Sequence, residues 1–146
     1  MSRGAQDPAR EIADSCIAFR VRLLNRAVTR IYDDVLREQG VTIAQVNLLV
    51  ATSLLGEIRA TDLSKRLSME RSTLSRNLER LRDMELLEAL DSEDARSQPF
   101  RATAQGKRLL KRILPAWREA QASAEELLGT SILSRLDAAA QRVQGH

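Results

Sequence analysis

The side chains best suited to chemistry lie in residues 71–83, where hydroxyl and guanidinium groups are interspersed with leucines. In a helix, at about 100° per residue, Leu74, Leu78 and Leu81 share one side. Arginine can make two parallel hydrogen bonds to a guanine edge, worth roughly 1–3 kcal/mol of discrimination, and hydroxyl groups bind phosphates. By itself the pattern fits a nucleic-acid contact and an ordinary solvated helix face equally well. The polar side would carry Ser72, Arg76, Glu79, Arg80 and Asp83, with Thr73 at its edge.

A helix that enters the major groove normally meets base edges with its N-terminal half. We therefore expect Ser72, Thr73 and Arg76 to face bases, with Arg76 the best candidate for a guanine. Ser75 and Arg80 are expected to contact phosphates, as are the free N–H groups at the helix start.

A β-hairpin is predicted next, from extended residues 86–90 and 99–102 joined by the polar tip 91–98. The tip presents Arg96 where an arginine can enter a narrow minor groove, and Asp94 precedes it closely enough to hold the guanidinium. The alternative for this pair is a surface salt bridge worth roughly 0–1 kcal/mol. Because the hairpin directly follows the polar helix, it favours duplex DNA as the partner.

The elements that must position these groups begin with a short helix over residues 62–67, with Thr61 as its expected N-cap. Ser68 breaks the chain before a second helix over residues 69–84. Two helices joined by a short turn form a helix-turn-helix, in which the second helix enters the major groove.

A further helix is predicted upstream, over residues 43–55, with Thr42 as its N-cap and Gly56 as its stop. Ile58 is expected in a short strand. The residues expected to face inward from this helix are Val46, Leu49, Val50 and Leu54.

Two long helical segments flank this unit. Residues 10–38 carry two apolar stripes, more than a small core needs, so we expect one helix that packs on its own domain and on a partner chain. Gly40 should end it in a left-handed cap. Thr103 should cap a helix that continues to about residue 128 with a kink at Pro115, and Ser131 should cap a last helix.

The composition narrows the classes of function. The 146 residues carry a net charge of +3, and only 3 of the 23 basic residues are lysines. With one cysteine, and one histidine at the last position, we expect no internal disulfide, no metal site, no cofactor and no catalytic residues. Without an apolar run near the roughly 18 residues of a membrane span or a signal-peptide core, we expect a cytoplasmic protein.

Several motifs, in this order and spacing, resemble the MarR family of bacterial transcription regulators. They are the Arg-Ser-Thr-Leu-Ser-Arg run at 71–76, the Asp94-Ala-Arg96 tip and the Thr103-Ala-Gln-Gly106 helix start. The stretch GVTIAQVNLL at 40–49 is similar to the second helix of the family. The order of elements matches from about residue 12 to residue 143.

The resemblance implies a mainly α protein with a small β-hairpin wing, that is, a winged helix-turn-helix with long N- and C-terminal dimerisation helices. Residues 10–40 and 104–146 would form the helical dimerisation region, and residues 41–103 the DNA-binding region. It also implies a homodimer on a pseudo-palindromic operator, with Arg96 reaching the minor groove. The function implied is a sequence-specific transcriptional regulator, a repressor that associates with the bacterial nucleoid when bound to DNA.

The sequence departs from the family at the wing. Glu85 stands where the family usually has glycine, and a left-handed non-glycine residue costs about 1 kcal/mol, so the turn is expected to change shape. Pro99 cannot donate a ladder hydrogen bond, and Ala102 replaces a larger apolar residue. Both changes predict a short or frayed wing.

The resemblance also implies release from DNA by a small molecule or by oxidation. Cys16 lies where some members carry a sensing cysteine, although the tyrosines of the peroxide-sensing branch are replaced by Arg20 and Arg30. A small buried hydrophobe is the stronger interpretation of Cys16. A pocket for a small-molecule effector would be lined by Phe19, Arg20, Asn47 and Trp117, although core packing explains the aromatic residues equally well.

Two other classes of function are weighed against this one. A helical protein–protein adaptor would use the long terminal helices and would not bind DNA. An enzyme is disfavoured because the chain has neither a glycine-rich phosphate loop nor clustered carboxylates with an evident task. Asp91, Glu93 and Asp94 do cluster, but solvation of the hairpin tip explains them better.

Overall fold

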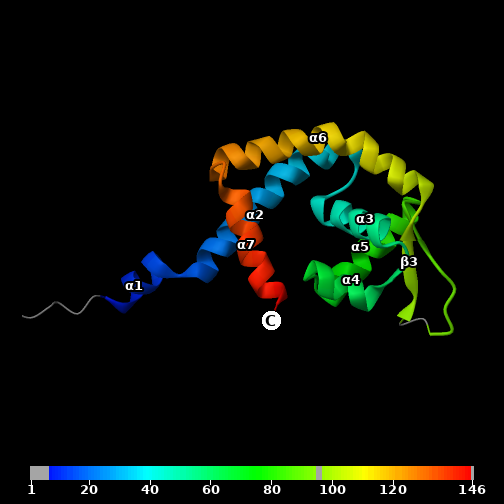
Figure 1. Ribbon diagram of the computed structural model, residues 1–146, viewed down its shortest axis with the longest axis horizontal. Coiled ribbons are helices and arrows are strands. Elements are labelled where there is room, and N and C mark those ends of the chain that lie inside the picture. Colours follow the sequence, from blue (N-terminus) through cyan, green and yellow to red (C-terminus); the bar gives the residue numbers. More distant parts are fainter. Residues whose placement is uncertain (1–6, 95–96, 146) are drawn as a thin grey trace, which may run out of the picture.

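The computed structural model describes residues 7–94 and 97–145. It is mainly helical, with one small antiparallel sheet, as expected. Figure 1 shows a winged domain under an arch of two long helices, with an N-terminal arm that points away from it. In chain order the elements are α1 Pro8–Ser15, α2 Ile17–Leu36, η1 Arg37–Gln39, α3 Ile43–Leu55, β1 Ile58–Arg59, α4 Ala60–Leu67, α5 Arg71–Asp83, β2 Leu87–Ala89, β3 Pro99–Ala102, α6 Ala104–Leu128 and α7 Ile132–Gln144.

The hydrophobic core lies between α3, α4, α5, the sheet and the first half of α6. Leu74, Leu78 and Leu81 of α5 are at most 4% exposed, which confirms the expected leucine face. From α3, Val46 and Leu49 point inward as expected, together with Leu48 and Thr52. The expectation for Val50 and Leu54 was wrong, because those side chains are 39% and 80% exposed on the outer side of α3.

Helix α3 starts with a complete capping box. Gln45 N–H donates to Thr42 Oγ1 at 3.3 Å, and Thr42 N–H donates back to Gln45 Oε1 at 3.1 Å. Thr103 caps α6 as expected, because its Oγ1 accepts from Gly106 N–H at 3.0 Å. The caps expected from the side chains of Thr61 and Ser131 are not seen. Helix α4 starts one residue before Thr61, after Arg59, and Ser131 precedes α7 without a capping hydrogen bond from its side chain. Arg59 is extended, with a ψ of 149°, where it pairs with Pro99 in the sheet. It therefore takes the N-cap position, and α4 begins at the next residue.

The sheet has the strand order β1-β3-β2, and both pairs are antiparallel. Pro99 stands inside it, opposite Arg59, and its carbonyl accepts a 2.9 Å hydrogen bond from Leu90 N–H. A proline keeps its acceptor, so it interrupts only the donor half of a ladder. The fraying expected at Pro99 is therefore absent, and Ala102 is buried opposite Leu87.

Left-handed backbone occurs at Gly40, Ser68 and Glu85 among the described residues. Gly40 has a φ of 72° and ends the first helical segment, as expected. Glu85, with a φ of 58°, takes the left-handed conformation that glycine would take, so this turn is kept at an energetic cost. Its N–H donates to Arg82 O at 2.8 Å, and Leu86 N–H donates to Leu81 O at 2.9 Å, which closes the end of α5.

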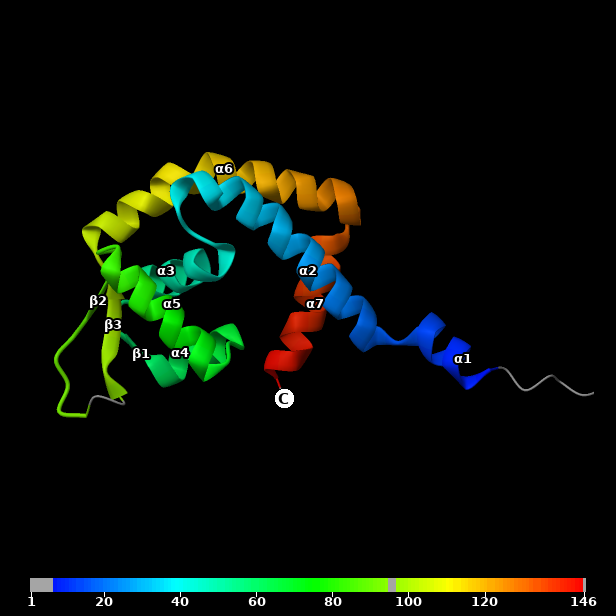
Figure 2. The ribbon, with the colours of Figure 1, turned by 180° about the vertical axis from the view of Figure 1, so that it is seen from behind.

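The expectation of one N-terminal helix was wrong, because the chain breaks at Cys16, where ψ is 112°. The Arg20 guanidinium donates to Cys16 O at 3.0 Å and to Asp14 O, so it satisfies carbonyl groups that the break leaves without helical partners. Figure 2 shows α1 and the first turns of α2 as an arm beyond α7.

Helix α6 continues through Pro115 for 25 residues and is bowed in Figure 1. It packs along α2, where Tyr32 Oη donates to Gln121 Oε1 and the Tyr32 and Trp117 ring centroids are 6.4 Å apart. Burial, with the nearby charge of Glu125, raises the pKa of Tyr32. Among the described helices, none is both long and apolar enough to cross a bilayer.

Candidate nucleic-acid interface

Helix α5 presents a polar face to solvent. Ser72, Ser75, Arg76 and Arg80 are exposed, while Thr73 is half-buried at the edge of the face. Arg76 Nη2 lies 3.5 Å from Thr73 Oγ1, so two of the three side chains predicted to face bases are neighbours. The opposite side of α5 is anchored by the three buried leucines. The fold therefore holds this polar face outward on a rigid support.

The start of α5 is open to an anion. Glu70 takes the N-cap position without a capping hydrogen bond from its side chain, and the first turn carries no acidic residue. The first N–H groups of a helix lack intrahelical partners and attract negative charge. The turn before it is fixed by Ser64, whose hydroxyl donates to Met69 O at 2.8 Å. This end of α5 is chemically suited to a phosphate.

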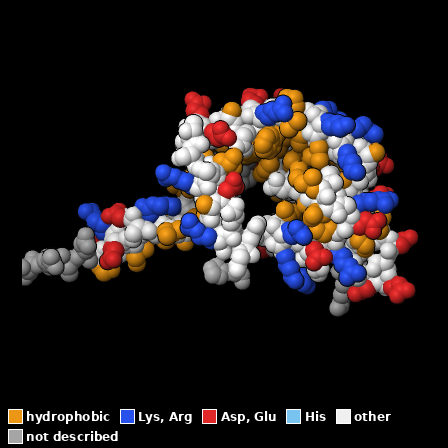
Figure 3. Space-filling view, in the orientation of Figure 1, with side chains coloured by type: hydrophobic (Ala, Val, Ile, Leu, Met, Phe, Trp, Pro, Cys, Tyr) orange, Lys and Arg blue, Asp and Glu red, His pale blue; other side chains and the backbone are white. Residues whose placement is uncertain are grey.

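A basic depression beside α4 escaped the sequence analysis. Arg59, Lys65 and Arg66 line it, together with Leu55, Glu57, Ile58 and Asp62. Figure 3 shows Lys and Arg side chains around the end of the domain that carries α4. The available signal was the pair Lys65–Arg66 in the last turn of α4, which is also what a helix dipole favours.

The wing is held by one arginine that spans the sheet. Arg101 of β3 lies opposite Glu88 of β2, and its Nε donates to Glu88 Oε1 at 2.5 Å. Its Nη1 is also 3.6 Å from Glu57 Oε1, next to β1. The hydrogen bond and the charge of Glu88 raise the pKa of Arg101. Arg101 therefore links all three strands.

The wing tip is described only in part. Ser97 N–H donates to Asp94 O at 3.0 Å, and Asp94 N–H donates to Ser92 Oγ at 3.4 Å. Arg96, the residue predicted to reach the minor groove, lies outside the described residues. The described strands β2 and β3 place the wing in the same domain as α5, against which β2 packs.

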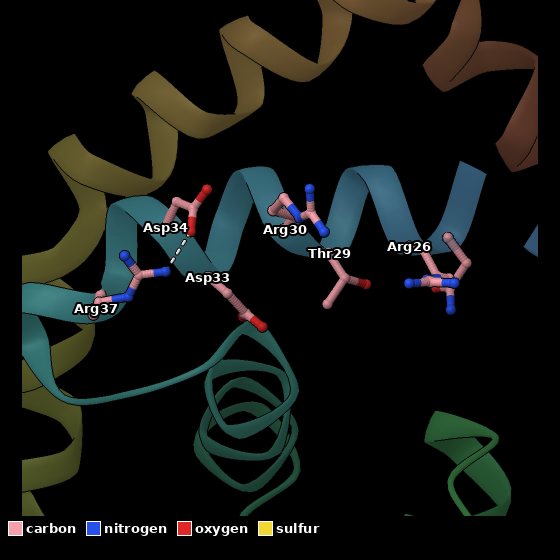
Figure 4. Close-up of a pocket in the computed structure, with 7 residues that line it drawn as sticks. Arg26, Thr29, Arg30, Asp33, Asp34 and Arg37 are labelled. Atoms are coloured by element: carbon pink, nitrogen blue, oxygen red, sulfur yellow. Dashed lines mark hydrogen bonds and ion pairs between the residues drawn. The ribbon is translucent and has the colours of Figure 1, made fainter. Parts of the chain in front are cut away.

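A second concave surface, here named the α2 groove, has a volume of about 400 Å³. Figure 4 shows it along α2 where that helix passes the start of α3. Asp33 accepts a 2.8 Å hydrogen bond from Ile43 N–H, and Arg37 pairs with Asp34 at 2.5 Å. The groove is lined by Asn25, Arg26, Thr29, Arg30, Asp33, Asp34 and Arg37.

The residues predicted to line an effector pocket are not gathered within one chain. Phe19 is 61% exposed and lies 13 residues before Tyr32 in α2, roughly 20 Å at ~1.5 Å per residue. Trp117 contacts Tyr32, and Asn47 is exposed on α3. Arg20 is engaged by backbone carbonyls, and Cys16 is a half-buried free thiol at the helix break. None of these residues lines the α2 groove.

Residues 7–94 and 97–145 are the ranges in which side-chain positions are described. In those ranges no three histidine, cysteine, aspartate or glutamate side chains gather as metal ligands. The hydrogen-bond donors of the candidate interface are hydroxyl, guanidinium, ammonium and backbone N–H groups.

Comparison with known proteins identifies relatives of this fold. The sequence model of the MarR family matches residues 39–97. The chain is similar to the transcriptional regulator MosR of M. tuberculosis, solved in complex with DNA, with 29% identity, 90% of this chain and 98% of that chain covered, and a TM-score of 0.73. No curated protein sequence matches the chain significantly.

Two more distant structures share the fold. A mutant of E. coli MarR complexed with operator DNA is 21% identical, and the match covers 94% of this chain and 99% of the MarR chain, with a TM-score of 0.77. BpsR of Bordetella bronchiseptica is 19% identical, covers 89% of this chain and 99% of its own, and also has a TM-score of 0.77.

Proposed function

Because this chain belongs to the MarR family of winged helix-turn-helix transcription regulators, we propose that it binds a pseudo-palindromic operator in duplex DNA as a homodimer and represses transcription. It is a DNA-binding regulator and not an enzyme. The observation that carries the proposal is the outward polar face of α5, which is backed by Leu74, Leu78 and Leu81. The bacterial cytoplasm is the compartment proposed for it.

The proposed roles follow from where each group lies. Ser72, Thr73 and Arg76 meet base edges in the major groove, and Arg76 makes a bidentate contact to a guanine. Ser75, Arg80 and the open start of α5 bind phosphates. Arg96, positioned by Asp94, enters the minor groove.

A second copy of the chain is proposed to cover the terminal helices. Large apolar side chains are exposed along the arm, including Ile17 at 76% and Phe19 at 61%, and Figure 3 shows this apolar surface. Helix α7 exposes Val143 at 74%. Exposed patches of this kind mark protein interfaces, and a two-fold pairing of recognition helices matches a palindromic site.

The releasing signal is proposed to be a small anionic molecule in the α2 groove. Arg26 and Arg30 stand one helical turn apart along it, with Thr29 between them, so guanidinium and hydroxyl donors border the groove together with the carboxylates of Asp33 and Asp34. Oxidation of Cys16 is the weaker alternative. Arg20 is the nearby cation that could activate the thiol, but its guanidinium donates to the backbone carbonyls of Cys16 and Asp14. Benzoate is a simple probe: it should raise the Tm of the wild type and not that of Arg30→Ala.

The test of DNA binding compares three arginines of α5. Arg76→Ala should weaken binding to a duplex enriched by the wild type by roughly 10- to 100-fold and flatten sequence preference. Arg80→Ala should weaken binding to all duplexes alike and lower the salt slope by about one ion. Arg82→Ala, an exposed residue in the last turn, is the control. Unchanged sequence preference in Arg76→Ala would refute the assignment of α5.

The adaptor alternative makes a separate prediction. A helical adaptor would leave random duplex DNA unshifted in a gel at low salt. Steep weakening of binding with rising salt, by contrast, is what release of counterions from phosphates produces.

A further inference from the structure

We propose that three polar side chains, Asp33, Gln45 and Asn77, position recognition helix α5 against α2 and thereby set operator specificity. Asp33 of α2 accepts from the backbone at the start of α3, and Gln45 of α3 donates to Asn77 of α5, so two separate hydrogen bonds link α2 to α3 and α3 to α5. None of the three touches DNA in this account. The inference rests on the proposed DNA-binding function and adds positioning residues to it.

The central link joins α3 to α5. Gln45 is 8% exposed, and its Nε2 donates to Asn77 Oδ1 at 3.2 Å. Asn77 Nδ2 in turn donates to Thr73 O at 3.0 Å, one turn earlier on α5. The other end of the Gln45 amide accepts from Thr42 N–H at 3.1 Å. Because both ends of both amides are engaged, their orientation is defined.

This link supplies what the leucines of α5 do not. Apolar contacts are non-directional, so Leu74, Leu78 and Leu81 resist separation of α5 more than rotation about its axis. Side chains extend roughly 5–6 Å from a helix axis, so a 10° turn moves their ends by about 1 Å. Hydrogen bonds to bases weaken steeply over that distance. A directional bond beside Thr73 opposes such a turn.

The second link joins α3 to α2. Asp33 Oδ1 accepts a 2.8 Å hydrogen bond from Ile43 N–H at the start of α3. Figure 4 shows Asp33 pointing from α2 toward that helix. Since α2 also packs along α6, these two links tie α5 to the helices proposed to form the dimer. The spacing between two recognition helices would then depend on these bonds.

Gln45 has a simpler role as a capping residue, and the two roles are separable. The capping box uses only Oε1 of Gln45 and its backbone N–H. Donation from Nε2 to Asn77 is not itself one of the hydrogen bonds of the α3 cap. A purely capping Gln45 would leave Asn77 without influence on sequence preference.

The test replaces both amides with apolar groups of similar size, Gln45→Met with Asn77→Leu, so that neither partner of their bond is left unpaired. This change also removes the Gln45 acceptor of the α3 cap, whereas Asn77→Ala leaves the cap intact. The readout is the ratio of Kd for a scrambled duplex to Kd for a duplex enriched by the wild type. It is measured at a temperature where circular dichroism shows every variant folded. Gln121→Met is the matched control, because it removes another half-buried amide, the partner of Tyr32, outside the winged domain.

We expect the ratio to fall at least 10-fold in the double variant, while its Kd for the scrambled duplex stays within two-fold of the wild type. Gln121→Met should keep the wild-type ratio. Asn77→Ala, which favours helix, should show the same loss if the double variant does not fold. A folded variant lacking the Gln45–Asn77 bond with the wild-type ratio would overturn the inference. If the wild type enriches no duplex, the proposed function itself is overturned, and this inference with it.

Discussion

The winged domain and the terminal helices treat their apolar residues in opposite ways. The winged domain buries Leu48, Leu49, Leu63 and Leu81 completely. By contrast, helices α1 and α7, whose positions are all described, have no buried residue. Helix α2 buries only Leu36. The winged domain has a hydrophobic core that is complete within a single chain. The terminal helices have the apolar spacing of buried helices, but many of their apolar side chains are exposed.

The comparison teaches that stability and assembly are carried by different parts of the sequence. Mutations in the winged domain should act on the free energy of unfolding of each chain. Mutations or dilution that affect the terminal helices should act through association, because exposed apolar surface of this extent is an interface feature.

The largest effect is expected in the core of the winged domain. Leu49→Ala should lower the free energy of unfolding by about 2–5 kcal/mol, since a fully buried side chain leaves a cavity. Urea denaturation measures the loss. Leu54→Ala on the same helix is the control, because Leu54 is 80% exposed and should change little. Equal losses would contradict the division of α3 into two faces.

A smaller loss is expected where α6 meets the sheet. A Cβ at Gly106 would lie 2.3 Å from Leu86 O, a backbone atom that has little room to move. Gly106→Ala should therefore cost about 1–3 kcal/mol of strain. Gly145→Ala, where the nearest atom would be 3.5 Å away, is the comparison variant. An unchanged urea midpoint for Gly106→Ala would show that this contact is not rigid.

Dilution tests the other side of the comparison. If a second copy covers the terminal helices, each tenfold dilution should cost about 1.4 kcal/mol of dimer stability and lower the Tm. Scanning calorimetry over a hundredfold range of concentration measures this. A Tm independent of concentration, with a monomer mass in sedimentation, would mean that the exposed apolar residues have another use.

The smallest effect is a gain. Glu85 holds a φ of 58°, so Glu85→Gly should stabilise the winged domain by about 1 kcal/mol. Glu85→Ala keeps the strain and should show no such gain. If both variants have the same urea midpoint, the left-handed conformation of residue 85 does not lower the stability of the winged domain.

Much of the winged domain could be predicted because its signals are local. Strand β3 at Pro99–Ala102 and the start of α6 after Thr103 follow from a hairpin pattern and a cap, and both were predicted at these residues. The leucine period fixed the buried side of α5. These features need no knowledge of a neighbouring helix.

The features that were missed depend on contacts between distant residues. The break at Cys16 is invisible in the apolar period, because both halves share it and Arg20 stabilises the break through backbone carbonyls. The bond between Gln45 and Asn77 requires the relative placement of two helices.

Two recognition helices related by two-fold symmetry are proposed to read duplex DNA. Selection of bound duplexes from a random pool by the full chain is the decisive experiment. We expect enrichment of a palindrome whose half-sites lie about one helical turn apart, roughly 10 base pairs from centre to centre. Recovery of no preferred sequence, or of a single unrepeated half-site, would contradict it.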